Sequence, residues 1–305
     1  MPSIPCLPDV WRLPLPAHYR AQDILAFHAR DRQALAEQVG PASLRKGLWW
    51  RGQAVVLQVD FRPGEALVRW QMAQKDPALA VQEGLPLAHR MLGLTQDVAV
   101  FEAQWAGHPL LGPVLRQQTG LRVPVAGTPF EALAWAIMGQ QISVAAAVSL
   151  RRRLILAADL RHASGLYCHP QAQQVLALGL EPLRQAGFSQ AKAQSLLAVC
   201  EAVQAGALPL DAWAEQSTVP AEQIGQALLA IKGIGPWTVG YTLLRGFGWL
   251  DGSLHGDVVV RRSIAQLLQA DVDQARAAAW LAPFAPWRAL VGAHLWAMQA
   301  LKYTP

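Results

Sequence analysis

Two glycines and a proline interrupt a helical pattern near the C-terminal end of the chain, in the stretch IKGIGPWT at residues 231–238. Gly233 and Gly235 can adopt a positive φ and have no side chain, so the backbone there can approach another molecule closely. Pro236 suits the first turn of a following helix, whose free amides and dipole favour an anion. An ordinary turn between two helices is the alternative, and the motif taken alone favours that turn.

A carboxylate follows the glycines, one helix and one loop later, in the stretch LHGDVVVRRSI at residues 254–264. Asp257 stands directly before an apolar-periodic segment that is rich in arginine. An aspartate in this place is typical of a helix N-cap, and capping alone is the simpler explanation of Asp257. The glycine turn and the aspartate together therefore carry more information than either motif does by itself.

The elements that must position these residues change in character along the chain. A helical segment at residues 21–38 precedes two alternating runs, at residues 54–61 and 65–72, which the turn RPG separates. This pattern predicts an antiparallel hairpin with a helix against it. From about Asp76 onward, short helical patterns alternate with glycine or proline, which predicts an almost entirely helical remainder.

Some helix boundaries are marked clearly. The stretch TPFE is a capping box, in which Glu131 is placed to reach back to the amide of Thr128. The helix that starts at Pro129 is interrupted at GQQIS, residues 139–143, before a second apolar helix begins. Ser189 is the expected N-cap of another helix, which a glycine at position 206 closes.

Composition limits the class of protein in which these motifs act. The chain has 305 residues, of which 52% are hydrophobic and 15% charged, which predicts a folded protein of two or three domains. No apolar run reaches the roughly 18 residues that a membrane span needs, and the start lacks a leader pattern, so a cytoplasmic protein is expected. The cysteines at positions 6, 168 and 200 fit no metal spacing and are expected to be reduced. The net charge of +5 suits a phosphate-binding surface without proving one.

The hairpin, followed about twenty residues later by an aspartate at the head of a helix, resembles the helix-hairpin-helix DNA glycosylases. Within them it is most similar to the bacterial 3-methyladenine DNA glycosylase II group. The resemblance extends over essentially the whole chain, including FEALAWAIMGQQIS, GFSQAKAQSL and PWRALVGAHLWAMQAL.

The resemblance implies a mainly α fold of two helical lobes with an N-terminal α+β domain that carries a small antiparallel sheet. The implied N-terminal domain covers residues 1–100. Residues 101–128 together with 248–305 would form the lobe that carries the catalytic aspartate. Residues 129–247 would form the lobe that ends in the helix-hairpin-helix.

The reaction of such an enzyme requires a carboxylate. Excision of a base places positive charge on the deoxyribose as the C–N bond lengthens. A carboxylate beside C1′ would stabilise this charge and orient or deprotonate the attacking water, and the resemblance assigns this role to Asp257. Strand-cleaving relatives carry a lysine two residues after the second glycine, where this chain has Trp237. A monofunctional enzyme that uses water and leaves an abasic site is therefore expected.

The damaged base would be held by aromatic rings. An alkylated purine of the 3-methyladenine or 7-methylguanine type carries positive charge, which a ring attracts by roughly 0.5 to 2 kcal/mol per contact. The resemblance implies a base pocket of Trp237, Tyr241, Trp296 and Phe27. Core packing is the alternative for each ring in a chain with 12 tryptophans. Trp237 and Tyr241 are four residues apart and are expected to share a helix face.

Contacts with double-stranded DNA are implied at two loops. The wedge that fills the gap left by a flipped base falls on Gln141, where the close relatives often have leucine and where glutamine buries less apolar surface. The hairpin residues Gly233, Gly235 and Thr238 would bind phosphate. Lys232, which replaces a proline common in the family, is expected to be solvated or to face phosphate.

The expected glycosylase reaction requires no cofactor. The backbone carbonyls of Leu229, Ile231 and Gly233 match those that hold a monovalent cation in the family, so a structural Na⁺ or K⁺ is possible. The iron–sulfur cluster of related branches is not expected, because no cysteine follows Cys200.

The predicted function is hydrolysis of the N-glycosidic bond of alkylated bases in base excision repair, by a monomeric, cytoplasmic, nucleoid-associated enzyme. Two alternatives stay open. One is a related monofunctional glycosylase for deaminated or oxidised purines. The other is a non-catalytic helix-hairpin-helix DNA-binding protein, against which Asp257 and the aromatic set together argue.

Overall fold

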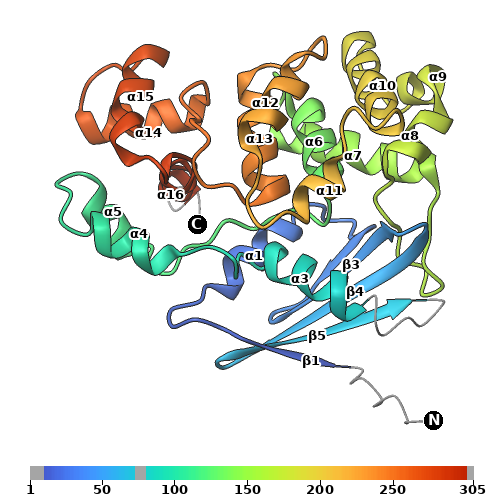
Figure 1. Cartoon of the computed structure of the whole chain (residues 1–305), viewed down its shortest axis with the longest axis horizontal. Coiled ribbons are helices and arrows are strands. Elements are labelled where there is room, and N and C mark those ends of the chain that lie inside the picture. Colours follow the sequence, from blue (N-terminus) through green and yellow to red (C-terminus); the bar gives the residue numbers. More distant parts are fainter. Residues whose placement is uncertain (1–9, 73–79, 301–305) are drawn as a thin grey trace.

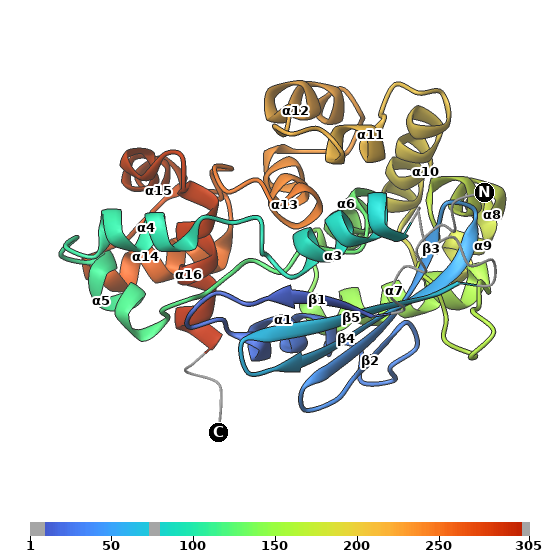
Figure 2. The same cartoon turned by 60° about the horizontal axis from the view of Figure 1, so that its bottom comes forward.

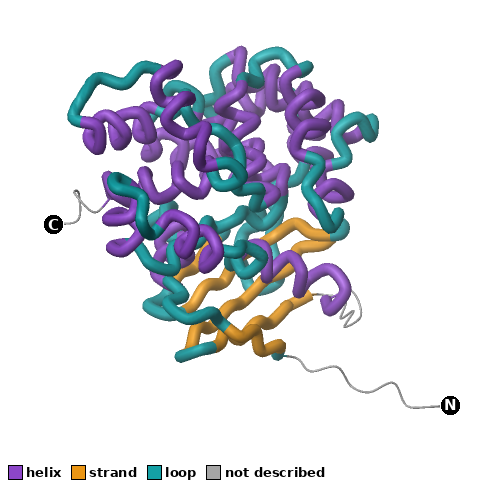
Figure 3. Tube along the Cα trace, turned by 60° about the vertical axis from the view of Figure 1, so that its left-hand side comes forward, coloured by secondary structure: helices purple, strands orange, loops and turns teal. Residues whose placement is uncertain are grey.

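A five-stranded antiparallel sheet forms one end of the molecule, and helices form the rest (Figures 1 and 3). The computed structural model describes residues 10–72 and 80–300. The fold class predicted from the sequence, mainly helical with a small N-terminal sheet, is confirmed. Of the three cysteines, Cys168 and Cys200 are buried and free, whereas Cys6 lies outside the described residues.

The sheet has the order β1-β5-β4-β3-β2, and its strands are β1 (Trp11–Pro14), β2 (Glu37–Val39), β3 (Ser43–Trp50), β4 (Gln53–Arg62) and β5 (Glu65–Met72). The predicted hairpin is confirmed as β4–β5, with Arg62 opposite Glu65 in the register. Consecutive residues Val55, Val56 and Leu57 of β4 are all fully buried, so both faces of this strand are covered. Figure 2 shows the sheet with the helices α1 (Ala21–His28) and α3 (Leu85–Met91) beside it.

The predicted helix at residues 21–38 is too long. Helix α1 ends at His28, and the Asp31 side chain accepts a hydrogen bond from the amide of Gln33 in a turn that follows. Ala34 then has a φ of 52°, and the chain enters β2 at Glu37. Local side-chain bonding and sheet pairing thus override a helical composition in this stretch.

The helical part follows in chain order after a π-helical turn at Ala80–Gly84. Its helices are α4 (Val98–Trp105), α5 (Leu111–Gln117), α6 (Pro129–Gly139), α7 (Val144–Ala158), α8 (Ala172–Leu178), α9 (Leu180–Gln185), α10 (Gln190–Gln204), α11 (Leu210–Ala214), α12 (Ala221–Leu229), α13 (Pro236–Phe247), α14 (Val258–Leu268), α15 (Gln274–Leu281) and α16 (Arg288–Ala300), with a 3₁₀ turn at Ala282–Phe284.

Three hydrophobic cores hold these elements. One lies under the sheet with α1 and α3, a second joins α6 through α13, and a third joins α4, α5 and α14 through α16. Helix α13 contributes to two of them, because Leu243 and Phe247 pack in the second core and Leu244 in the third. Helix α13 therefore connects the two helical regions. The domain boundaries stay a prediction, since packing alone does not test which segments fold independently.

Helix α6 begins as expected, with Thr128 Oγ1 accepting a hydrogen bond from the amide of Glu131 at 3.1 Å. The return bond differs from the prediction, because Glu131 Oε2 accepts from the amide of Gly127 at 3.0 Å. Its Oε1 binds Lys46 Nζ at 2.8 Å and Arg151 Nη2 at 2.7 Å, and these cations set the position of the carboxylate. The predicted N-cap Ser189 and the left-handed Gly206 after α10 are confirmed.

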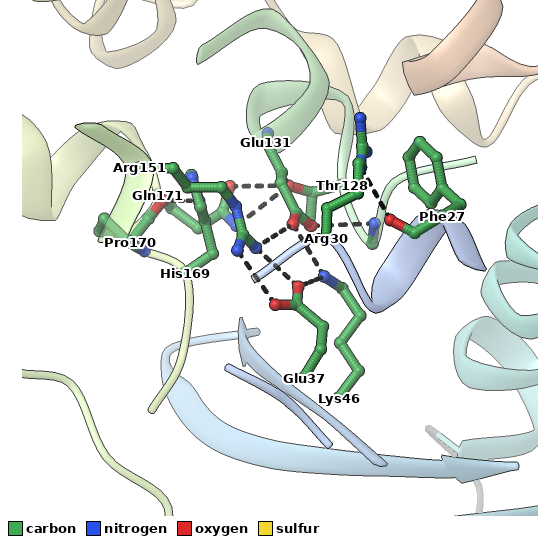
Figure 4. Close-up of polar contacts among 11 residues, drawn as sticks. Phe27, Arg30, Glu37, Lys46, Thr128, Glu131, Arg151, His169, Pro170 and Gln171 are labelled. Carbon is green, nitrogen blue, oxygen red and sulfur yellow. Dashed lines mark hydrogen bonds and ion pairs between the residues drawn. The ribbon is translucent and has the colours of Figure 1, made fainter. Parts of the chain in front are cut away.

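Lys46 and Arg151 also bind Glu37, so two carboxylates and two cations form one buried network (Figure 4). Glu37 and Lys46 come from β2 and β3, whereas Glu131 and Arg151 come from α6 and α7. The two signs balance, as burial of charge requires. The network fixes the sheet against the helices that carry the loops described next.

Candidate active site

The hairpin between α12 and α13 is the first element of the site. Gly233 has a φ of 90°, whereas Gly235, the N-cap residue of α13, is extended with a φ of −111°. A Cβ on Gly233 would meet Ser195 Oγ at 2.1 Å, while one on Gly235 would meet nothing within 4 Å. Gly233 is thus required by internal packing and by its backbone conformation. Gly235 is the glycine that faces open space, where an anion could approach the first turn of α13.

The hairpin is held from the protein side by Gln140. Its Nε2 donates to the carbonyl of Gly233 and to Thr238 Oγ1, each at 3.0 Å. Ser195 Oγ adds a bond to the carbonyl of Lys232 at 2.9 Å. Thr238 is buried, and its hydroxyl faces Gln140, so a phosphate contact from this side chain stays a prediction. Lys232 is exposed, which agrees with the expected solvated lysine.

The carbonyls assigned to a cation are partly engaged. Gly233 O accepts from Gln140, and Ile231 O accepts from the amide of Ile234 at 3.1 Å. Each carbonyl has a second lone pair, so these groups and Leu229 O retain acceptor capacity for a monovalent cation. Within residues 10–72 and 80–300, no cluster of three His, Cys, Asp or Glu side chains could hold a metal ion.

Asp257 is the N-cap of α14 and is half-buried. Its Oδ1 accepts from the amides of Val259 and Val260 at 2.9 and 3.0 Å, and from Trp296 Nε1 at 3.1 Å. Among the described residues, its Oδ2 accepts only from Trp237 Nε1, at 3.0 Å. The cap predicted from the sequence is confirmed. Because Oδ1 has three donors, Oδ2 is the oxygen with lone-pair capacity for another group.

Three rings line up beside this carboxylate. Trp237 and Tyr241, on one face of α13 as expected, have ring centroids 5.4 Å apart. Tyr241 and Trp296 of α16 are 6.3 Å apart. An ion pair between Arg288 and Asp251, 2.8 Å long, ties the start of α16 to the loop before Asp257. The fold therefore brings Trp237, Tyr241, Trp296 and Asp257 together from separate segments.

Sequence comparison finds a family similar to the segment that contains Trp237, Tyr241 and Asp257. Residues 134–281 match the family described as HhH-GPD superfamily base excision DNA repair protein. This match covers just under half of the chain. It is 30% identical over 190 residues to DNA-3-methyladenine glycosylase 2 of Escherichia coli, which covers 61% of this chain and 63% of that protein. It is 29% identical over 167 residues to the DNA-3-methyladenine glycosylase of Bacillus subtilis, 54% of each chain. The chain thus spans between about half and two thirds of these relatives.

Solved structures share the fold of this protein over nearly the whole chain. The 3-methyladenine DNA glycosylase from Archaeoglobus fulgidus superposes with a TM-score of 0.82 at 20% identity, covering 96% of this chain and 100% of that one. An 8-oxoguanine glycosylase/lyase from Clostridium acetobutylicum in complex with double-stranded DNA superposes with a TM-score of 0.71 at 14% identity, covering 94% and 93%. At these identities the likeness establishes the fold alone.

Phe27 reaches the candidate site through Arg245. The Arg245 guanidinium carbon lies 4.8 Å from the Phe27 ring centroid and 5.4 Å from that of Trp296. Arg30 lies 4.0 Å from Phe27 and 4.4 Å from Trp135 of α6. Phe27, Arg30, Trp135, Tyr241 and Arg245 line one cavity. Phe27 thus borders the aromatic group through Arg245, and its role as a pocket wall stays a prediction.

Gln141 lies at the exposed tip between α6 and α7, with a φ of 56°. This left-handed conformation is costly for a residue with a side chain, and such strain is concentrated at functional loops. Its neighbours Ile142 and Val144 are 40% and 62% exposed, although both are large and apolar. The interruption predicted at GQQIS is therefore exposed, while the wedge role stays a prediction.

Sequence reasoning missed Gln140, Arg30 and Arg245. Arg245 had a signal, because it lies four residues after Tyr241 and eight after Trp237, on the same helical face. Gln140 had none, since its partners are distant in sequence, whereas Arg30 follows Phe27 by three residues. Within the described residues, every helix is too short or too polar to cross a bilayer.

Proposed function

We propose that this protein is a monofunctional DNA glycosylase that flips an alkylated base out of duplex DNA and hydrolyses its N-glycosidic bond. The products are the free base and an abasic site. The Asp257 carboxylate carries this proposal, because it stands half-exposed beside Trp237, Tyr241 and Trp296 with Oδ2 free to accept another group. The similarity to proteins named DNA-3-methyladenine glycosylase supports the choice of alkylated bases.

In this mechanism the C–N bond breaks with its electron pair leaving on the base, and positive charge develops at C1′. The negative charge of Asp257 stabilises that cation, which is the interaction that grows toward the transition state. Water adds at C1′, and its proton passes to Asp257 Oδ2 or to solvent. The two indole donors and the helix amides fix the carboxylate, so little reorganisation is needed during the reaction.

The choice of water as nucleophile rests on Trp237. This residue occupies the place at which strand-cleaving relatives are expected to carry a lysine, and its indole donates to Asp257 instead. A Schiff base requires a primary amine. The amine of Lys46 does not fill this role, because it is buried and paired with two carboxylates.

DNA would contact the open amides at Gly235 and the tip at Gln141, while the flipped base enters between the rings. A flipped base leaves a gap that a side chain must fill, and glutamine can bond the orphaned partner base. The enzyme would act as a monomer on double-stranded DNA, in the cytoplasm and in association with the nucleoid.

Asp257→Asn tests this function. Asparagine still caps a helix, so folding is retained, but the negative charge is lost. Excision of 3-methyladenine and 7-methylguanine from methylated duplex DNA should fall by roughly 10²- to 10³-fold, while binding to an abasic-site duplex stays largely intact. Asp273→Asn is the matched control, because Asp273 caps α15 in the same way through the amide of Arg276.

Three results would contradict the proposal. Full activity of the Asp257→Asn variant would remove the carboxylate from the mechanism. A wild-type protein that binds DNA and releases no base would favour the non-catalytic alternative. Release only from duplexes with hypoxanthine or oxidised purines would favour the alternative of a glycosylase for deaminated or oxidised purines.

A further inference from the structure

Two arginines alternate with aromatic rings in a row that lines the cavity from Trp135 to Arg245 and continues beyond it to Trp296. From one end to the other, the order is Trp135, Arg30, Phe27, Arg245 and Trp296, with guanidinium carbons 4.4, 4.0, 4.8 and 5.4 Å from successive ring centroids. Trp296 is also bonded to Asp257. This guanidinium wall, defined by Arg30 and Arg245, is therefore continuous with the proposed base pocket. Figure 4 shows Arg30 beside Phe27, bonded to the Phe27 carbonyl.

Neither guanidinium is neutralised within the described part of the chain. Arg245 Nη1 donates to the carbonyl of Pro124 at 2.9 Å, and its Nε is buried without a partner. Arg30 Nε donates to the carbonyl of Phe27 at 2.8 Å. No carboxylate lies in ion-pair range of either side chain among these residues, in contrast to Arg151 and Arg152 nearby. Burial lowers the pKa of Arg245 to about 10, which leaves it charged at neutral pH.

The two guanidinium groups offer donors and no acceptors, and the three carboxylates that line the same cavity, Asp31, Glu37 and Glu131, are paired with Arg152, Lys46 and Arg151. Arginine has five N–H donors, and Arg245 and Arg30 each use one of them in a hydrogen bond to a backbone carbonyl of the described residues. A purine with a carbonyl at C6 presents an acceptor that matches a guanidinium, as arginine matches guanine O6 in DNA recognition. A purine with an amino group at C6 presents donor hydrogens there, which find no acceptor on the guanidinium wall.

We propose that Arg245, assisted by Arg30, is a specificity residue that favours alkylated purines with a C6 carbonyl, of the 7-methylguanine type, over those with a C6 amino group, of the 3-methyladenine type. This proposal rests on the function proposed above and adds the substrate preference. Aromatic rings already paired with guanidinium groups also contribute less attraction to a second cation, so hydrogen bonding gains weight in the choice of base.

Duplex DNA treated with dimethyl sulfate tests this preference, because it contains 7-methylguanine and 3-methyladenine in one substrate. The released bases are separated by chromatography, and the ratio of the two excision rate constants is compared between variants. Arg245→Gln should lower the 7-methylguanine to 3-methyladenine ratio by about tenfold, as expected for loss of a hydrogen bond from a charged donor. Arg245→Lys, which keeps the charge, should restore part of the ratio.

A structural role for Arg245 predicts a different result, since lost packing would slow both excisions alike and leave the ratio unchanged. That outcome would overturn the proposal, as would a wild-type enzyme that releases 3-methyladenine only. Arg276→Gln, at an exposed position on α15, is the control and should not change the ratio. If Arg245→Gln fails to fold, the ratio for Arg30→Gln decides in the same way. Release of neither base by the wild type would instead contradict the proposed function.

Discussion

At the scale of the residue, the two oxygens of Asp257 are not equivalent. Within the described part of the chain, Oδ1 accepts from two backbone amides and from Trp296, whereas Oδ2 accepts from Trp237 alone. The indole bonds orient the carboxylate without cancelling its charge, because an indole N–H is neutral. Two aromatic residues expected to hold the base therefore also position the carboxylate.

Substitution of each indole by phenylalanine separates these contributions. Trp237→Phe removes the one donor to Oδ2 and should lower single-turnover excision by roughly tenfold or more, since a hydrogen bond to a charged group contributes about 1.5 to 3 kcal/mol. Trp296→Phe removes one of three donors to Oδ1 and should cost less. Single-turnover rates on methylated DNA measure both, and an equal loss in the two variants would show that ring stacking outweighs orientation.

At the scale of the element, the hairpin combines two glycines with separate tasks. Gly233 fits against Ser195 in a left-handed conformation, and Gly235 leaves the N-terminal turn of α13 open. Gln140, next to the exposed tip at Gln141, fastens the hairpin at Gly233 and Thr238. The two loops proposed to meet DNA are thus joined by one side chain.

The glycines provide a matched pair of variants. Gly233→Ala should lower the free energy of unfolding by about 1 to 3 kcal/mol, because it combines an unfavourable φ with a clash. Gly235→Asp should leave stability nearly unchanged and weaken binding to all DNA sequences alike, since it places a carboxylate where phosphate is expected. Urea unfolding and fluorescence anisotropy on two unrelated duplexes measure these effects. Unchanged DNA affinity of Gly235→Asp would exclude the hairpin from DNA binding.

At the scale of the whole molecule, buried charge and buried histidines join the sheet to the helices. Burial raises the pKa of Glu37, but Arg151 and Lys46 outweigh it and hold the pKa at about 2. Burial lowers the pKa of His28 to about 3 and that of His169 to about 4. Both histidines lie against this network, and both are neutral in the folded protein at neutral pH.

Stability should therefore fall as the pH falls. The pKa values of His28 and His169 are lower in the folded state than the ordinary 6.5, so the unfolded chain binds more protons below pH 6.5. The contribution of these histidines to the free energy of unfolding is complete above pH 6.5 and is lost as the pH falls toward 4 and 3. Glu37 also destabilises the folded protein as the pH falls below about 4.5.

Urea unfolding between pH 7.5 and 5 measures this slope. His28→Phe should flatten it, whereas His18→Asn, at an exposed position, should leave it unchanged. A wild-type protein equally stable at both pH values would contradict the prediction.

The sequence by itself determined the features that depend on local chemistry. The β4–β5 hairpin, the caps at Thr128 and Ser189, the shared face of Trp237 and Tyr241, and Asp257 at the head of α14 all follow from residue type and short spacing. The helical fold followed from the resemblance of these motifs to a known family.

Only the tertiary structure decided what depends on partners far apart in the chain. Glu131 does not bond the amide of Thr128, because its carboxylate is paired with Lys46, 85 residues away, and with Arg151. Trp296 meets Asp257 across 39 residues, and Arg245 stands between Phe27 and Trp296 through the packing of three helices. Such contacts arise from core packing and charge burial, which no local pattern encodes. They determine the shape and charge of the proposed base pocket.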